Sequence, residues 1–343
     1  MKRVVIIVGV FLCVLFLHAE KAHTFFDLLN PRYLIVDNNQ IIISDYPHVY
    51  LYSLDDYSLI KKIGREGMGP GEFHVIQANM NLKERGLVVS VRPDHMAANS
   101  TSRLSYFTRK GDFIREIKLP YGINAKFLSL GDQLLGFLPL REGKLSVTLF
   151  DKDLKKQNEI LNCDYWFNLQ SRKPANFFDR ASDTLFVSIY KDRIYLARGD
   201  APLFAIHVYD FKGNKLITVE HDSEKFRIPP SFTGEIHEHF KIKFQRSANY
   251  TIKNLNLPKH FPAIRNFSVQ DDKIYVLTFK KVSRENEVLV FDVNGNLLKK
   301  VFLPVRVMNP ELLCPFSFYK DMFYQLVFNE ETVNWELHIT DIN

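Results

Sequence analysis

Residues 209–217 read YDFKGNKLI and residues 291–299 read FDVNGNLLK, so one short phrase occurs twice in this chain. Looser copies lie at Tyr52–Ile60, Tyr106–Ile114 and Phe150–Leu154. Each copy combines an apolar strand, a tight polar turn and the start of a second strand, which is the pattern of a β-hairpin. A hairpin that recurs along a chain predicts a repeat architecture.

The composition favours sheet over helix. The chain has 343 residues, of which 46% are apolar and 24% are charged, an ordinary globular balance. It contains 29 Phe and 15 Tyr, and aromatic side chains suit pleated, half-buried surfaces. Repeat β folds of this length often form one domain. We therefore predict an all-β domain over residues 20–343.

The spacing of the apolar segments predicts the blades of a propeller. Four short apolar strands lie between Tyr33 and Ile63, with Asn38-Asn39 as the first turn because Asn tolerates positive φ. A four-stranded antiparallel sheet of this kind is one propeller blade. Further units begin near residues 73, 123, 177, 263 and 312. We predict a six-bladed β-propeller of four-stranded antiparallel blades.

The last unit shows only three good strands. The segment His23–Leu29 is not needed by the first blade. We predict that it pairs with the last blade and closes the ring, because closure removes the exposed sheet edges that invite aggregation.

Two stretches break the repeat, residues 162–176 and residues 221–260. In the second, Ile236, Phe240, Phe244 and Ala248 recur every four residues, which indicates an apolar stripe on a helix. Phe240, Ile242 and Phe244 also alternate as in a strand. We predict a partly helical insertion over about residues 221–260, between blades four and five. Long insertions in repeat folds often lie on the binding face.

The N-terminus has the pattern of a signal peptide over residues 1–19. Lys2 and Arg3 precede the apolar run Val4–Leu17, and Leu17-His18-Ala19 resembles a cleavage site. The run is short for a membrane-spanning helix, which needs roughly 20 residues. An uncleaved membrane anchor is the alternative, and it would be the only membrane contact. We predict export to the periplasm or the extracellular space.

Charge and cysteine content add little. The formal charge of +6 is mild and the basic residues are scattered, so a solvated surface explains it better than an anionic partner. Nucleic-acid binding fits poorly, because aromatic residues do not interleave a basic patch. Cys163 and Cys314 could form one disulfide in an oxidising compartment or remain two buried thiols.

The loop Gly64–Phe73 reads GREGMGPGEF, and the stretch Leu257–Arg265 reads LPKHFPAIR. The first phrase resembles the bacterial six-bladed β-propeller family related to NHL-type and TolB-like propellers. The second resembles the Pro-x-Ile segment with which that family begins an inner strand after a partly helical insertion. With the hairpins, the resemblance covers essentially the whole chain after the signal.

The glycine loop itself predicts a structural role. Glycines allow positive φ, and Pro70 stiffens the turn. A phosphate-binding loop would end in Gly-Lys-Ser/Thr and lead into a helix, and this phrase does neither. We therefore predict that the loop carries the chain from one blade to the next. The residues assigned to it are Gly64, Gly67, Gly69, Pro70 and Gly71.

Patterns that suggest a metal site have simpler explanations. His237 and His239 would point to different faces of a helix, and no third ligand can be named from spacing. The segment that begins at Asp292 resembles a calcium loop but lacks its glutamate, whereas Asn-Gly is a strong hairpin signal. We predict a surface cluster and a turn, with no bound metal or other cofactor.

The sequence offers no catalytic residue by motif, because no Gly-x-Ser-x-Gly elbow occurs. The family resemblance does leave an enzymatic alternative, since related propellers include metal-dependent lyases and lactonases. A divalent ion on the propeller axis would then be held by His or Asn side chains near the inner strands. The candidates are His74, Asn79, Arg265 and Asn266.

We predict that the protein is a monomeric, non-catalytic binding scaffold for a peptide, a protein or a glycan. A repeat fold with long insertions and no catalytic motif favours binding over catalysis, although propellers host many functions. The alternative is a metal-dependent lyase or hydrolase with its site at the axis. The residues assigned to ligand binding are Arg65, His74, Asn79, Arg265, Asn266, His237 and His239.

Overall fold

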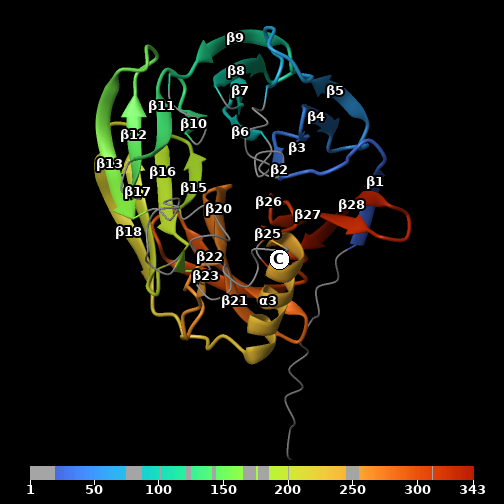
Figure 1. Ribbon diagram of the computed structural model, residues 1–343, viewed down its shortest axis with the longest axis vertical. Helices are drawn as coiled ribbons and strands as arrows, with labels where there is room; N and C mark the ends of the chain where they lie inside the picture. Colours follow the sequence, from blue (N-terminus) through green and yellow to red (C-terminus); the bar gives the residue numbers. More distant parts are fainter. Residues whose placement is uncertain are drawn as a thin grey trace, which may run out of the picture.

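The computed structural model describes residues 20–74, 87–100, 102–120, 125–140, 144–164, 175–176, 185–199, 201–244, 255–310 and 312–343. Its strands form a ring of sheets around a central axis, and the chain visits the sheets in order around the ring (Figure 1). The predicted signal segment lies outside these residues. Among the residues described, no helix has the length and apolar character needed to cross a membrane.

Blades one to three each contain four consecutive antiparallel strands. Blade one contains β2 (Tyr33–Asp37), β3 (Gln40–Asp45), β4 (His48–Ser53) and β5 (Leu59–Ile63). Blade two contains β6 (Val88–Val91), β7 (His95–Asn99), β8 (Arg103–Thr108) and β9 (Phe113–Lys118). Blade three contains β10 (Lys126–Ser129), β11 (Leu134–Pro139), β12 (Lys144–Phe150) and β13 (Lys156–Asp164).

Blades four to six complete the ring. Blade four contains β15 (Leu185–Tyr190), β16 (Arg193–Arg198), β17 (Phe204–Asp210) and β18 (Lys215–His221). Blade five contains β20 (Asn266–Gln270), β21 (Lys273–Val282), β22 (Glu285–Asp292) and β23 (Leu297–Leu303). Blade six contains β26 (Phe316–Tyr319), β27 (Met322–Asn329), β28 (Asn334–Asp341) and the N-terminal strand β1 (Glu20–Phe25). The predicted six-bladed propeller of four-stranded antiparallel blades is confirmed.

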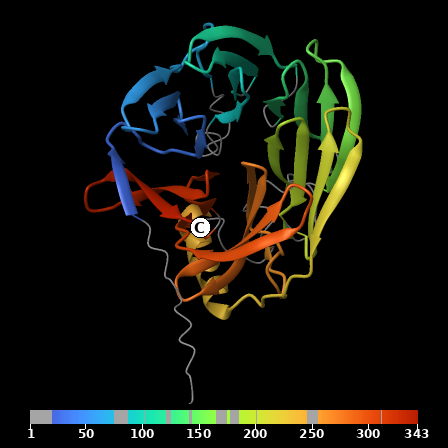
Figure 2. The same cartoon turned by 180° about the vertical axis from the view of Figure 1, so that it is seen from behind.

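The N-terminal strand closes the ring, as the three-stranded last unit predicted. β1 pairs antiparallel with β28, from Glu20 opposite Ile339 to Phe25 opposite Trp335. The strand begins three residues before the predicted His23 and ends before Leu29. The first and last described segments of the chain therefore share one sheet, which Figure 2 shows from behind.

A separate buried apolar cluster lies at each of the six interfaces between neighbouring blades. At the interface between blades six and one, the rings of Phe25 and Tyr52 lie 4.6 Å apart. Between blades five and six, Tyr275 stacks on Phe318 at 4.4 Å. Burial of apolar surface is the main stabilising contribution in such a ring, and here every blade receives it from both neighbours.

Serine side chains add hydrogen bonds between neighbouring inner strands. The Val36 N–H donates to Ser317 Oγ at 3.0 Å and joins blades one and six. The Val269 N–H donates to Ser188 Oγ at 3.1 Å and joins blades five and four. These contacts satisfy backbone groups on the inner edges of the blades, where no further strand pairs with them.

The hairpin turns have the chemistry that the sequence indicated. Asn38 and Asn39 adopt φ values of 47° and 61° between β2 and β3. Asp292 Oδ1 accepts hydrogen bonds from the N–H groups of Asn294 and Asn296, both at 2.9 Å. The carboxylate of Asp292 is therefore engaged by its own turn, which accounts for the resemblance to a calcium loop.

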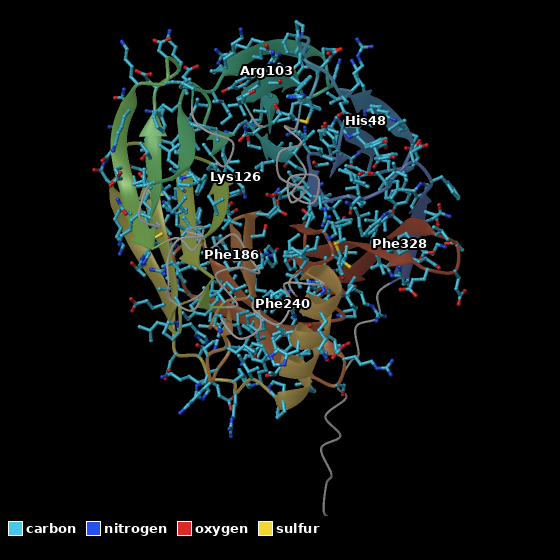
Figure 3. The ribbon with its side chains drawn as sticks, viewed as in Figure 1. His48, Arg103, Lys126, Phe186, Phe240 and Phe328 are labelled. Carbon is cyan, nitrogen blue, oxygen red and sulfur yellow. The ribbon has the colours of Figure 1, made fainter. Side chains whose placement is uncertain are left out.

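One α-helix, α3 (Pro230–Phe244), lies between β18 and β20 among the residues described. Ile236 and Phe240 are fully buried, whereas Ile242 is 76% exposed. The helical interpretation is therefore correct as far as Phe244, whereas Ala248 lies outside the described residues, and the alternative of a strand through Phe240 and Ile242 is wrong. A helical period places Ile236 and Phe240 on one face, where they pack with Phe261 and Phe279. Figure 3 labels Phe240 on α3.

Two short strand pairs lie outside the blades. β14 (Ala175–Asn176) pairs parallel with β19 (Leu255–Asn256), so the two stretches that break the repeat meet each other. β24 (Val307–Asn309) pairs with β25 (Leu312–Leu313) between blades five and six.

The two cysteines do not form a disulfide. Cys163 and Cys314 are both buried thiols. Cys163 belongs to the apolar cluster between blades three and four. Burial raises the pKa of the Cys314 thiol to about 11.

Candidate functional site

Side chains join blades that are not neighbours at one end of the ring, which we call the cap end. The turns that follow the innermost strands lie here. Arg92 Nη1 of blade two donates to the backbone oxygen of Lys191 in blade four at 3.0 Å. Gln270 Nε2 of blade five donates to Asp37 Oδ1 of blade one at 3.3 Å. Each contact skips the blade between its partners, so it links blades that do not share an interface.

Further ion pairs hold this arrangement in place. Arg109 Nη1 donates to Asp37 Oδ2 at 2.8 Å and to the backbone oxygen of Arg92 at 3.1 Å. Lys191 Nζ lies 2.6 Å from Asp272 Oδ1 in blade five. We call Asp37, Arg92, Arg109, Lys191 and Gln270 the polar cap. The polar cap therefore links blades one, two, four and five at this end.

The opposite end, the α3 end, carries α3 and the connections between consecutive blades. Because the strands of a blade alternate in direction, a connection between blades lies at the end opposite the innermost turns. Figure 1 shows α3 over the near face of blade five, and Figure 2 shows it behind the same blade. The candidates Arg65, His74, Arg265, Asn266, His237 and His239 therefore share one end. Asn79 lies outside the described residues.

The glycine loop at the α3 end packs against its own side chains. Gly64 has φ +76°, and a Cβ there would lie 2.2 Å from Cε2 of the buried Phe73. Glu72 accepts the Gly69 N–H at 2.7 Å and the Arg65 Nε–H at 2.6 Å. These two contacts lower the pKa of Glu72. Arg65 is thus exposed but already paired within its loop.

Arg265 lies immediately before β20, at the α3 end of the innermost strand of blade five. Its N–H donates to the backbone oxygen of Leu277 at 2.9 Å, which fixes the backbone. Its guanidinium lies over the ring of Phe279 at 5.2 Å, and Phe279 stacks on Phe261 at 4.5 Å. Burial lowers the pKa of Arg265 to about 10. The next residue, Asn266, is half-buried and pairs with Leu277 in the sheet.

Two further charged residues, Lys281 and Glu235, belong to this region. Desolvation lowers the pKa of Lys281, and the positive charge of Arg265 adds to the shift. Glu235 of α3 acts on Lys281 in the opposite direction. Lys281 lies near the end of β21 and is exposed. Arg265 lies directly before β20, Lys281 lies on its partner β21 in blade five, and Glu235 lies on α3; we call these three residues the α3 charge cluster.

The two helical histidines do not act together. Residues two apart on an α-helix differ by about 200° around its axis, so His237 and His239 point away from each other. The ring of His239 lies 5.9 Å from that of Phe240. Within the described parts of the chain, no three His, Cys, Asp or Glu side chains are grouped to hold a metal ion. A metal held by His74, Asn79 and Asn266 stays the untested alternative, since Asn79 is not described.

His74 differs from its expected place. It was placed near the start of the inner strand of blade two, but the described inner strand, β6, begins at Val88. Residue 177, near which the fourth unit is predicted to begin, lies outside the described residues, and the described inner strand of blade four begins at Leu185. The glycine loop explains the first difference, because Phe73 packs between blades one and two before the strand begins.

Phe279 and Lys281 were missed by sequence reasoning. Both lie on β21, which is ten residues long and extends past the end of its partner β20. The sequence gives no sign that the ring of Phe279 supports Arg265. For Lys281 a usable signal was present, because two adjacent lysines, Lys280 and Lys281, follow the apolar part of β21.

The fold defines a closed propeller with no established active site. The chain belongs to the 6-bladed beta-propeller family, whose profile matches residues 27–249. No curated protein matches the sequence significantly. The finer resemblance to NHL-type and TolB-like propellers stays a prediction.

Several solved structures are similar to this chain. A Bacteroides fragilis NCTC 9343 protein presumed to be exported is 15% identical, with 95% of each chain covered and a TM-score of 0.55. The WD40 domain of Neurospora crassa Pan2 is 9% identical, with 91% of this chain and 89% of that chain covered and a TM-score of 0.42. Kluyveromyces lactis Hsv2p is 11% identical, with 88% and 81% covered and a TM-score of 0.36. At such identities, the Bacteroides structure shows a common fold and nothing about the ligand.

Proposed function

We propose that the protein is an exported, monomeric, non-catalytic scaffold that binds a peptide, protein or glycan at the α3 end of the propeller. The observation that carries the proposal is the polar cap. At the cap end, Arg92 and Gln270 are engaged in contacts between non-neighbouring blades, so the α3 end is the better place for a ligand to approach the axis. The irregular segments gather at the α3 end, as insertions in repeat proteins often do on a binding face.

Export is part of the proposal. It is supported by the signal-like residues 1–19 and by the description of the Bacteroides fragilis structure. Similarity of fold carries no ligand from that protein to this one.

Arg265 is the best position at which to test the binding end. Its guanidinium has no ion pair within the described residues, whereas Arg65 is held by Glu72. Reversal of charge at Arg65 would disturb the loop as well as any ligand, so its result would be ambiguous. The matched control is Lys212, which is exposed on a hairpin turn at the cap end.

The experiment captures partners from the exported fraction of the producing cells with three immobilised proteins: wild type, Arg265→Glu and Lys212→Glu. We expect one component to be retained by wild type and by Lys212→Glu but lost by Arg265→Glu. Equal retention by all three proteins would place the binding surface elsewhere. The retained component is then incubated with the wild-type protein and analysed by mass spectrometry, and turnover to a product would overturn the non-catalytic assignment.

A further inference from the structure

Basic residues occur throughout the chain, and one connection contains them without any acidic residue. From His239 to Gln270 the sequence contains six Lys or Arg residues and no Asp or Glu. The formal charge of this stretch equals the +6 of the whole chain, so the rest of the protein is neutral overall. The stretch includes the end of α3 and leads into β20 at Arg265. Of these six, the structure describes the side chains of Lys241, Lys259 and Arg265, and a basic surface favours a ligand of the opposite charge.

Arg265 differs from three other arginines that are largely covered. Arg109 lies 2.8 Å from Asp37, and Arg103 lies 2.9 Å from Glu116. Arg92 has the more distant Asp192 at 3.9 Å. In the part of the chain that the structure describes, Arg265 has no carboxylate partner and only the face of Phe279 beneath it. A half-buried guanidinium without a counter-ion is costly, and a bound anion would offset that cost.

The charge of the α3 charge cluster suits a single negative charge. Arg265 and Lys281 are positive, and Glu235 is negative, so the cluster has a net charge of one. A carboxylate matches this charge, whereas a phosphate would bring close to two negative charges at neutral pH. The planar guanidinium also matches the geometry of a carboxylate, because two parallel N–H groups can donate to its two oxygens.

Apolar side chains are exposed on the same elements. Val282 follows Lys281 and is 48% exposed, and Ile242 of α3 is 76% exposed. Ile242 lies two helical turns beyond Glu235, so both occupy the same side of α3. A peptide that alternates acidic and apolar side chains would find partners of both kinds here.

We propose that Arg265 and Lys281 bind a carboxylate side chain of an acidic, partly apolar peptide segment at the α3 end. The inference rests on the proposed scaffold function and names the chemistry of its ligand. Arg265 provides the paired donors on the support of Phe279, and Lys281 provides a second, mobile charge from the end of β21. Glu235 disfavours a second acidic group at the same point.

The test measures fluorescence anisotropy of a labelled glutamate–leucine peptide against the full mature chain, with a glutamine–leucine peptide as the uncharged match. We expect the glutamate peptide to bind more tightly, with a preference that weakens as salt is added. Arg265→Met and Lys281→Met should each weaken binding by about tenfold or more, the usual loss for a charged hydrogen bond. Lys300→Met is the control, because Lys300 pairs with Glu287 and lies outside the cluster.

The outcomes separate this inference from the proposed function. Equal binding of the two peptides, or equal binding by wild type and both Met variants, overturns the carboxylate site. Binding of a sulfated monosaccharide without binding of the glutamate peptide also overturns it. If the peptide fails but Arg265→Glu still loses the captured component, only the carboxylate assignment is wrong. If Arg265→Met does not fold, Arg265→Lys keeps the charge without the paired donors and should bind with intermediate affinity.

Discussion

Gln270 Nε2 donates a hydrogen bond to Asp37 Oδ1 at 3.3 Å, although the two residues are 233 positions apart and belong to blades separated by a third. Asp37 also receives Arg109 at 2.8 Å, so one carboxylate links blades one, two and five. This relationship distinguishes the two ends of the ring. At the cap end, polar side chains of different blades form hydrogen bonds and ion pairs with one another. At the α3 end, Arg265 has no described carboxylate partner.

Loss of the Asp37 carboxylate should destabilise the whole ring. In Asp37→Ala, the side chain of Arg109, only 13% exposed, loses its carboxylate, and Gln270 loses its acceptor. Because the site is only partly covered, we expect a loss of about 2 kcal/mol in the free energy of unfolding. Urea denaturation measures it. Asp112→Ala is the control, since its pair with Lys61 is exposed, and it should lose much less. Equal effects in the two variants would contradict a special role for the polar cap.

Removal of the closing strand should expose the edge of β28. Deletion of residues 20–30 should lower the melting temperature markedly or make the protein insoluble, because β28 would then be an unpaired edge. A melting temperature equal to that of the wild type would show that β1 does not close the ring.

A matched pair of point variants refines the same prediction. Phe25 is 2% exposed and packs on Tyr52, whereas the adjacent Phe26 is 78% exposed. We expect Phe25→Ala to cost about 3 kcal/mol and Phe26→Ala less than about 0.5 kcal/mol in urea denaturation. Similar losses would mean that the burial of Phe25 is not what stabilises blade six.

The architecture could be predicted because local signals repeat. Asn38-Asn39 specifies its turn through the backbone preferences of its own residues, and the turn at Asp292 does so through hydrogen bonds within five residues. The four-residue spacing of Ile236 and Phe240 likewise indicated a buried helical face. The closing strand was predictable because the last unit lacked a partner. In each case, the information lies within one short segment or in a comparison of equivalent segments.

The polar cap and the α3 charge cluster could not be predicted in the same way. Arg92 and Gln270 are ordinary polar residues near turns, and their partners are fixed only when the ring closes. Arg265 was selected from a resemblance, but its support by Phe279 depends on how far β21 extends past β20. Contacts of this kind depend on the diameter of the ring and the lengths of neighbouring strands, which no single segment encodes.

The buried thiol of Cys314 should make stability depend on alkaline pH. Burial raises its pKa to about 11 in the folded protein, while an ordinary thiol ionises near about 8.5. The folded pKa is the higher one, so this contribution is complete below the unfolded pKa and is lost as pH rises towards the folded one. Between pH values of about 8 and 10 the loss should be about 1 to 2 kcal/mol. Other groups titrate here too, so the measurement compares urea midpoints of wild type and Cys314→Ala, and identical pH dependence would contradict the prediction.

A variant of Gly64 can test whether this glycine is needed for packing of the loop or for binding of a ligand. Gly64→Ala places a Cβ 2.2 Å from the ring of Phe73 in a backbone conformation with φ +76°. Gly131 has φ +96° but no atom within 4 Å of the added carbon, so Gly131→Ala isolates the cost of the backbone conformation. We expect about 1 kcal/mol for Gly131→Ala and about 3 kcal/mol for Gly64→Ala, because the second also displaces a buried ring between blades one and two. Urea denaturation checks both values. If Gly64→Ala cost no more than Gly131→Ala, the packing of Phe73 would not explain the glycine, and close approach of a ligand to the loop would become the better explanation.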